Sequence, residues 1–415
     1  MIKPIEFEGF TFVEHGVCAP KGFKAAGICC GIKPSNTTKR DLAVIYSDTL
    51  CSAAACYTLN KVKGAPIAVT KKNLADGKAQ AVIVNSGNAN TCNADGEEKA
   101  QRMCELAAEA LGVKASDVIV GSTGVIGQIL PMEPIEAKIS ELAKSISVEG
   151  ATDAAEAIMT TDTVKKELAV RFELGGKECT IGAMAKGSGM IHPNMATMLS
   201  FLTTDAAVSP EVLQLALSRV VEDTFNMVSV DGDTSTNDTV AILASGTAGN
   251  AVIDNVEMPE FEVFVNALYV VLMNISRALA ADGEGASKLL ECVVSGAVDE
   301  RNAKIIAKGV ITSTLFKCAM FGEDANWGRI LCAIGYSEAD LDINKVEVLL
   351  ASQAGSVQVC ADGAGVAFSE EKAAEILKEE EIKIIVNLGD GSAKAVAWGC
   401  DLTYDYVKIN GDYRT

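Results

Sequence analysis

The stretch Lys186–Leu199 reads KGSGMIHPNMATML and decides which kind of fold the chain can have. Glycines relax the backbone ahead of the pair Ala196-Thr197, and an apolar segment typical of a strand, Met198–Leu202, begins directly after it. Packing explains a threonine at this junction poorly. We interpret its hydroxyl as the group that attacks the preceding peptide bond, so that Thr197 becomes a new N-terminus and a catalytic nucleophile.

An N-terminal threonine carries its own base, because an unperturbed α-amine titrates near pH ~7.7–8.0. The chain has only two histidines, His15 and His192, and neither has neighbours with the spacing of a zinc site or a catalytic triad. Acid–base chemistry must then depend on carboxylates, lysines, hydroxyls or an α-amine. Most Ala-Thr pairs at strand starts are structural, so a simple turn at Thr197 is the alternative interpretation.

Composition indicates a soluble globular protein. The 415 residues are 49% hydrophobic and 22% charged, which suits one large core or two ordinary ones. The net charge of −19 argues against nucleic acid and anionic membranes as partners. Thirteen scattered cysteines without a C-x-x-C pair indicate reduced core residues and no metal site. Without a signal peptide or about 18 uncharged apolar residues in a row, we expect a cytoplasmic protein.

Strand-like and helical segments alternate along the whole chain, as in a layered α/β or α+β protein. Because the strands are short or alternating, a doubly wound parallel sheet is not favoured. Ser209 and Pro210 have the residue types of a helix cap and first turn. The expected strands are Leu42–Tyr46, Ala81–Val84, Val118–Gly121, Glu167–Phe172, Met198–Thr203, Thr239–Leu243, Leu289–Val294, Val346–Leu350, Ile382–Val386 and Ala393–Trp398. The expected helices are Gly96–Leu111, Pro134–Ser147, Pro210–Val228, Pro259–Ala281 and Glu300–Ile311.

Three polar motifs lie between these elements. The glycine-rich loop Val120–Gly127 could turn backbone N–H groups and the Thr123 hydroxyl toward an anionic oxygen, or be an ordinary turn. Asp231–Asp238 begins like a calcium loop but lacks its later glycine and glutamate, which favours a polar turn that lines a cleft. In Ala281–Ala286 the glycines fit a helix C-cap, while Glu284 between them is suited to a cationic ligand; the residues alone favour neither reading.

Taken together, these motifs resemble the ornithine acetyltransferases of arginine biosynthesis, also called glutamate N-acetyltransferases or the ArgJ family. The similarity extends from Gly22 to the last residue, and several long motifs in one order are more specific than any single motif. The resemblance is carried by Lys186–Leu199, Ser122–Gly124, Asp231–Thr239, Asp282–Ala286, Gly322–Arg329 and Asn410–Thr415.

The resemblance implies an αββα-type sandwich, an α+β fold related to the DmpA aminopeptidases. It implies that the precursor cleaves itself between Ala196 and Thr197. The products would be an α chain, residues 1–196, and a β chain, residues 197–415. Two copies of each chain would form a heterotetramer.

The resemblance also implies the reaction. Thr197 would take the acetyl group of N2-acetyl-L-ornithine and pass it to L-glutamate by a ping-pong mechanism, giving ornithine and N-acetylglutamate. No metal or bound cofactor would be required, and a second activity with acetyl-CoA as donor stays open. Thr123 and Gly124 match the oxyanion hole. The substrate-contacting positions are Thr160, Lys186, Thr197, Glu284, Asn410 and Thr415, of which Lys186 suits an α-carboxylate and Glu284 an ammonium group.

Two other classes of protein compete with this interpretation. An aminopeptidase or amidase with an N-terminal nucleophile would share the self-cleavage and the oxyanion hole but pass the acyl group to water. A non-catalytic, acidic, oligomeric binding protein would keep an intact chain in which the region of Thr197 is only a turn.

Overall fold

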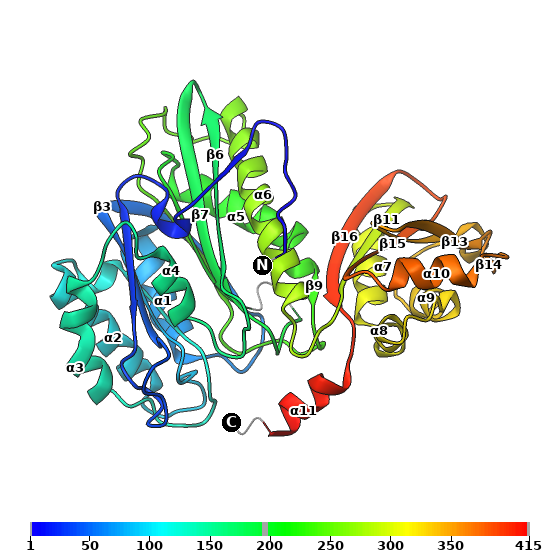
Figure 1. Cartoon of the computed structure of the whole chain (residues 1–415). Coiled ribbons are helices and arrows are strands. Elements are labelled where there is room, and N and C mark those ends of the chain that lie inside the picture. Colours follow the sequence, from blue (N-terminus) through cyan, green and yellow to red (C-terminus); the bar gives the residue numbers. More distant parts are fainter. Residues whose placement is uncertain (1, 193–197, 413–415) are drawn as a thin grey trace.

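The computed structural model describes residues 2–192 and 198–412 and builds them around two β-sheets (Figure 1). The first sheet has nine strands, with the order β1-β6-β7-β8-β10-β3-β4-β5 and β2 paired to β3. Its strands are β1 (Thr11–Val13), β2 (Phe23–Ile28), β3 (Leu42–Tyr57), β4 (Lys78–Asn85), β5 (Val118–Ser122), β6 (Lys166–Leu174), β7 (Lys177–Lys186), β8 (Leu199–Thr204) and β10 (Thr239–Ala244).

The long strand β3 connects the two halves of this sheet. Its first part, residues 42–47, pairs with β2 and β4, and its last part, residues 52–57, pairs with β10. An irregularity between Tyr46 and Cys51 shifts the register against β4. Such irregularities bend a strand and increase its twist. One cluster of buried side chains draws residues from both halves, among them Ile45, Val82, Phe201 and Leu243. The two halves therefore face each other across an inner core.

Helices cover the outer face of each half, and the result is an αββα sandwich. One outer core packs the half with β4 and β5 against α1 (Ala65–Asn73), α2 (Gly96–Leu111) and α3 (Glu133–Lys144). The other packs β6, β7, β8 and β10 against α5 (Pro210–Asp223) and α6 (Pro259–Ala281). The short α4 (Ala151–Ala157) contributes to the inner core. The predicted α+β fold class is confirmed.

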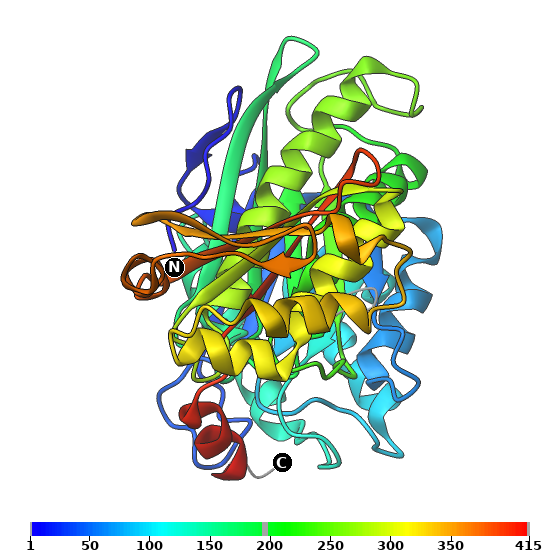
Figure 2. The ribbon, with the colours of Figure 1, turned by 90° about the vertical axis from the view of Figure 1, so that its right-hand side faces the viewer.

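The second, seven-stranded sheet has the order β14-β13-β12-β15-β11-β16-β9. Helix α6 lies between the two sheets (Figures 1 and 2), and its Arg277 pairs with Glu381 of β15 at 2.6 Å. After β16 the chain returns toward the sandwich as α11 (Tyr404–Asp412) (Figure 1). The strands are β9 (Val228–Ser229), β11 (Leu289–Ala297), β12 (Glu347–Ser352), β13 (Gly355–Ala361), β14 (Ala364–Gly365), β15 (Glu381–Asn387) and β16 (Ala393–Cys400), and the other helices are α7 (Glu300–Thr312), α8 (Thr314–Phe321), α9 (Trp327–Gly335) and α10 (Glu370–Leu377).

Helix α6 is the most membrane-like element among the described residues. Among the described residues, it is the helix that by length and apolar composition could cross a membrane. In the fold, however, 83% of its most apolar stretch is buried inside the protein, as in the core helix of a globular domain.

The predicted elements are all present, with changes at their ends. Helices Gly96–Leu111 and Pro259–Ala281 have the predicted bounds, and the Ser209 side chain accepts a hydrogen bond from the Val212 N–H as a cap. The predicted helix Pro210–Val228 ends at Asp223, because Thr224 leaves the helical conformation with φ −125°. The chain then enters β9.

The proposed division into residues 1–196 and 197–415 falls inside the sandwich. Strands β7 and β8 are neighbours, with Lys186 opposite Leu199, so both chains would contribute strands to one sheet. The chain first joins the second sheet later, at β9, returns to the sandwich at β10, and enters the second sheet for its remaining strands after α6. The division is therefore a prediction about chemistry and does not follow a boundary of the fold.

Candidate active site

A pocket of about 240 Å³ collects six of the residues predicted from the sequence. Thr197, Ala196 and Thr415 lie outside the described residues, so the structure does not locate the predicted nucleophile. The described predicted residues in the lining are Thr123, Gly124, Thr160, Lys186, Glu284 and Asn410. The rest of the lining is Ala89, Ile126, Thr161, Gly189, Met190, Ser235, Thr236 and Asn237.

The turn after β5 brings Thr123 and Gly124 to the pocket. The Thr123 N–H donates to the Asn85 carbonyl, which leaves its hydroxyl for the pocket. Gly124 has φ 127°, and a Cβ there would lie 2.8 Å from the backbone nitrogen of Asn88. Only glycine fits this close approach. No described residue accepts a hydrogen bond from the Gly124 N–H, so this donor and the Thr123 hydroxyl are available to an oxygen atom in the pocket.

Lys186, the last residue of β7, is a buried lysine whose ammonium faces the pocket. Its Nζ lies 3.5 Å from the Thr123 hydroxyl. Burial lowers the pKa of Lys186, and the nearby Asp162 opposes this shift. A buried ammonium that forms no ion pair with a described carboxylate is suited to binding the carboxylate of a ligand.

Glu284 lies in the loop after α6, where hydrogen bonds to the loop after β7 and to α11 hold it in place. Its backbone N–H donates to the Ser188 carbonyl, and its carboxylate accepts from the Asn410 side chain at 2.8 Å. Gly285 has φ 69° and leaves room for α11, since a Cβ would lie 2.6 Å from the Tyr406 nitrogen. Helix α6 ends at Ala281 with Asp282 as its C-cap residue, and Glu284 lines the pocket; its binding of a cationic ligand stays a prediction.

The segment Asp231–Asp238 forms the polar turn that the sequence predicts. Asn237 is its central residue, because its amide donates to the Ala89 and Ser122 carbonyls. The Asp231 carboxylate accepts from the N–H groups of Met190 (2.6 Å) and Ile191 (3.0 Å), so it supports the loop that precedes the predicted cleavage point. Among the described residues, no three acidic, histidine or cysteine side chains come together as metal ligands.

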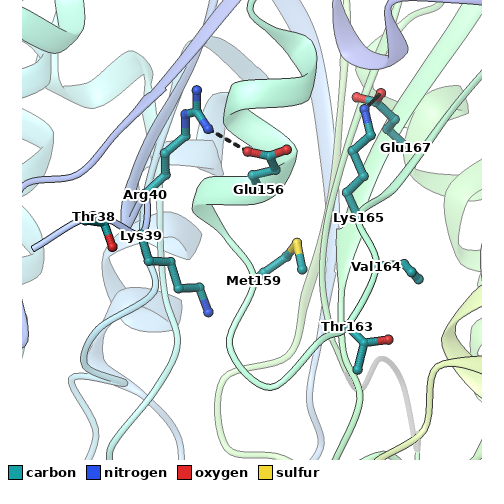
Figure 3. A pocket seen from close by; sticks show the side chains of 9 residues that line it. All are labelled: Thr38, Lys39, Arg40, Glu156, Met159, Thr163, Val164, Lys165 and Glu167. Carbon is teal, nitrogen blue, oxygen red and sulfur yellow. Dashed lines mark hydrogen bonds and ion pairs between the residues drawn. The ribbon is translucent and has the colours of Figure 1, made fainter. Parts of the chain in front are cut away.

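A larger cavity of about 760 Å³ adjoins the loop that carries Thr160 (Figure 3). Its charged side chains are occupied: Arg40 pairs with Glu156 at 2.6 Å, and Lys165 pairs with Glu167 at 2.7 Å. Lys39 donates to the Thr160 carbonyl at 2.7 Å. We take the smaller pocket as the candidate site, because the predicted polar residues that the structure describes converge there.

Sequence reasoning missed one group of residues near this pocket. Lys166 lies between the carboxylates of Asp162 and Asp282, with both N–O distances 2.6 Å. The spacing of four between Asp162 and Lys166 was visible in the sequence. The contact with Asp282 crosses 116 positions, and no local pattern signals it.

Comparisons with known proteins identify the family of the chain. The sequence profile of the ArgJ family matches residues 24–415, and the chain belongs to this family. The protein named "Arginine biosynthesis bifunctional protein ArgJ" of Caldanaerobacter subterraneus subsp. tengcongensis is 52% identical over 397 residues, which is 95% of this chain and 98% of that protein. The protein of the same name from Symbiobacterium thermophilum is 52% identical over 408 residues, 97% of this chain and 100% of that protein.

Solved structures of family members are also similar. The argJ protein of Bacillus halodurans is 43% identical and covers 51% of this chain and 97% of its own, with a TM-score of 0.48. The ornithine acetyltransferase of Mycobacterium tuberculosis, solved in complex with ornithine, is 37% identical and covers 45% of this chain and 100% of its own, with a TM-score of 0.41.

Proposed function

We propose that the protein transfers the acetyl group of N2-acetyl-L-ornithine to L-glutamate in arginine biosynthesis, through an acetyl-enzyme at Thr197. Membership of the ArgJ family along residues 24–415 carries the proposal. The relatives at 52% identity are named as arginine-biosynthesis proteins over nearly the same length, which supports the same pathway for this chain.

The first step is self-cleavage. The Thr197 hydroxyl oxygen attacks the Ala196 carbonyl carbon, the C–N bond breaks, and the threonine nitrogen becomes an amine. Water then hydrolyses the resulting ester and leaves Ala196 with a carboxylate. The products are residues 1–196 and 197–415, and Thr197 now has its amine beside its hydroxyl.

Acetyl transfer follows in two halves. The Thr197 oxygen attacks the acetyl carbonyl while its proton passes to the α-amine. The α-nitrogen of ornithine then takes that proton and leaves. The neutral α-amine of glutamate next attacks the Thr197 ester, so N-acetylglutamate forms and the hydroxyl is restored.

The pocket chemistry supports roles for its polar groups. The Thr123 hydroxyl and the Gly124 N–H are the donors that would stabilise the oxyanion of each tetrahedral intermediate. The Lys186 ammonium would bind the α-carboxylate that both amino acids share. Glu284 would bind the δ-ammonium of ornithine, with Thr160, Asn410 and Thr415 as further contacts.

Acetyl-CoA as a second donor and an assembly of two α and two β chains are further parts of the proposal. The word "bifunctional" in the names of the relatives supports a test of acetyl-CoA. Both chains would contribute to one sheet, since β7 precedes and β8 follows the cleavage point, which supports their lasting association.

The test combines mass with turnover. The active wild-type protein should give two products that end at Ala196 and begin at Thr197 by mass spectrometry, whereas T197A should remain one chain of 43.3 kDa and be inactive. An unbroken, active wild-type chain would refute the mechanism and favour the alternative of a binding protein with a simple turn.

The acceptor distinguishes transfer from hydrolysis. With acetylornithine alone, the wild type should release at most one equivalent of ornithine per site, and glutamate should start continuous formation of N-acetylglutamate. Continuous release of acetate without glutamate would favour the N-terminal-nucleophile amidase instead. Replacing acetylornithine by acetyl-CoA in the same assay tests the second donor.

A further inference from the structure

Lys166, Asp162 and Asp282 form a buried ion network next to the segments that line the pocket. Lys166, at the start of β6, is 0% exposed, and its ammonium lies 2.6 Å from Asp162 and 2.6 Å from Asp282. Two carboxylates therefore share one ammonium away from solvent. Such a group of charges is stable only while every member keeps its partners.

The two carboxylates also hold the backbone of the pocket. Asp162 accepts from the N–H groups of Thr160 (3.0 Å) and Gly187 (2.7 Å). Asp282 accepts from the Thr163 N–H, and its carbonyl accepts from the Ser188 hydroxyl at 2.7 Å. These contacts join the three segments that carry Thr160, Lys186 and Glu284.

Lys186 differs from Lys166 although both are buried and lie on the paired strands β6 and β7, where Lys166 is opposite Ala185. Lys186 forms no ion pair with a carboxylate of the described residues, and its Nζ lies 3.5 Å from the Thr123 hydroxyl. Asp162 is close enough to Lys186 to raise its pKa, but the Asp162 carboxylate forms its ion pair with Lys166. The network thus keeps one lysine paired and the other available.

We propose that Lys166 is a positioning residue that keeps Asp162 and Asp282 paired, so that the Lys186 ammonium stays available for the α-carboxylate of both amino-acid substrates. This inference rests on the proposed function. Without the Lys166 charge, Asp162 would form its ion pair with Lys186 and draw that ammonium away from the substrate.

Titration gives a second consequence. Burial lowers the pKa of Lys186, and Asp162 raises it again in part. When Asn replaces Asp162, the pKa of Lys186 falls further. Lys186 then loses its proton at a lower pH than in the wild type, and substrate binding weakens at that lower pH. The charged groups that act on Lys186 from the surrounding segments are Asp162, Lys166, Asp238, Glu284 and Lys39.

The decisive experiment compares K166M with K166M/D162N. K166M should raise KM for acetylornithine and for glutamate by about tenfold or more, with a smaller change in kcat. The double variant removes the carboxylate that would compete for Lys186, so its KM values should return to within about threefold of the wild type. K165M is the matched control, because the neighbouring Lys165 pairs with Glu167 at the adjoining cavity (Figure 3) and should leave both KM values unchanged.

A merely structural Lys166 predicts the opposite order, since a second change in the core would add to the damage. Equal or higher KM values in the double variant than in K166M, or wild-type KM values in K166M, would overturn the inference. If circular dichroism shows K166M unfolded, the pH dependence of KM in D162N provides the test. As the pH is raised, KM of D162N should increase at a lower pH than KM of the wild type, and an unchanged pH profile would overturn the inference. Failure of the proposed function is distinct, because the wild type itself would then lack acetyl transfer.

Discussion

Gly189 and Glu284 lie against each other in the candidate pocket, so the size of residue 189 decides where the Glu284 carboxylate can lie. A Cβ at Gly189 would lie 2.3 Å from the Glu284 carboxylate, so the two side chains cannot both occupy this place. Because the Glu284 carboxylate ends a flexible side chain, it can move aside without unfolding the protein. Glycine at position 189 therefore leaves space for the Glu284 carboxylate, and it is not required by the backbone conformation.

We expect G189A and E284Q to have the same effect on substrate binding. Each should raise KM for acetylornithine about tenfold or more, because a hydrogen bond to a charged group contributes about 1.5–3 kcal/mol. Steady-state kinetics with acetylornithine measures this effect, and unchanged melting temperatures provide the control for folding. Wild-type KM for acetylornithine in E284Q would remove the assigned role of Glu284.

His192 links the pH dependence of stability to the loop before the predicted cleavage point. Burial, and then the charge of Lys308, lower the pKa of His192 to about 4. Its ring nitrogen contacts the Ser229 hydroxyl at 3.0 Å, and its carbonyl accepts from the Thr234 hydroxyl. The folded protein therefore holds this imidazole neutral at pH values at which the unfolded chain protonates it.

The folded pKa of His192 is below its unfolded value of about 6.5, so stability from the neutral imidazole is complete above that pH. It is lost as pH falls toward 4, because the unfolded chain then binds more protons. H192Q should consequently lose less unfolding free energy than the wild type between pH 6.5 and pH 4. Urea unfolding at several pH values measures this difference. Parallel curves for the two proteins would contradict the assignment.

Helix α11 connects the second sheet to the pocket. Its Asn410 donates to Glu284, and its Tyr406 hydroxyl contacts the Asp231 carboxylate at 3.3 Å. Just before the helix, the Thr403 hydroxyl donates to the Gly285 carbonyl at 2.6 Å. Much of the helix surface is nevertheless exposed, since Tyr404 is 84% and Val407 68% accessible. The helix thus contributes to the site more than to any core.

Deletion of the last six residues, 410–415, should abolish acetyl transfer and leave the melting temperature nearly unchanged. The deletion removes Asn410 from Glu284 and the predicted contact Thr415, and the described residues Asn410 and Gly411 do not belong to a core cluster. Turnover and thermal unfolding of the same preparation provide the measurement. Y406F serves as a milder companion, and wild-type turnover in the deletion would exclude a role for the C-terminus.

Among the elements, those with strong periodicity could be predicted from the sequence and those without it could not. The helix Gly96–Leu111 has a regular apolar face, and its predicted bounds are the observed ones. Strand β3 extends eleven residues past the predicted end at Tyr46, because its second part is rich in small residues that give no alternation. The short strands β1, β9 and β14 and helix α11 also lack a periodic signal.

The pocket shows the same limit. Lys186, Glu284 and Asn410 could be named through the resemblance to a family, since each lies in a long motif. The ion network around Lys166 could not, because Asp282 is 116 positions away and a paired buried lysine has no signature of its own. Local spacing predicts what one segment does, whereas the site is assembled from segments brought together by the sheet.

At the scale of the whole molecule, the predicted cleavage would divide a sheet and not two domains. The strands on either side, β7 and β8, pair along Ile181–Lys186 and Leu199–Thr204. Their side chains share one buried cluster with α5 and α6, and Met198 belongs to it as well. The two products would therefore share a continuous core.

We expect the wild-type products to copurify and to separate only in denaturant. Residues 1–196 and 197–415 expressed in separate cells should each be insoluble or unfolded, because the strand pairs β7–β8 and β10–β3 and the buried clusters of the sandwich join the two products. Size-exclusion chromatography and circular dichroism measure both outcomes. A soluble, folded product of either half would contradict the shared core and point to independent domains.

The neighbouring strands β7 and β8 also determine how the protein recovers from heat. In the intact precursor they are joined by residues 187–198, so their pairing is a fast intramolecular event. Cutting that link turns the same pairing into an encounter between two molecules, whose rate depends on their concentration. A cleaved enzyme cooled after boiling would then regain little structure at low concentration, whereas the uncut T197A chain would refold. Cleavage would therefore make thermal unfolding of the enzyme irreversible in practice.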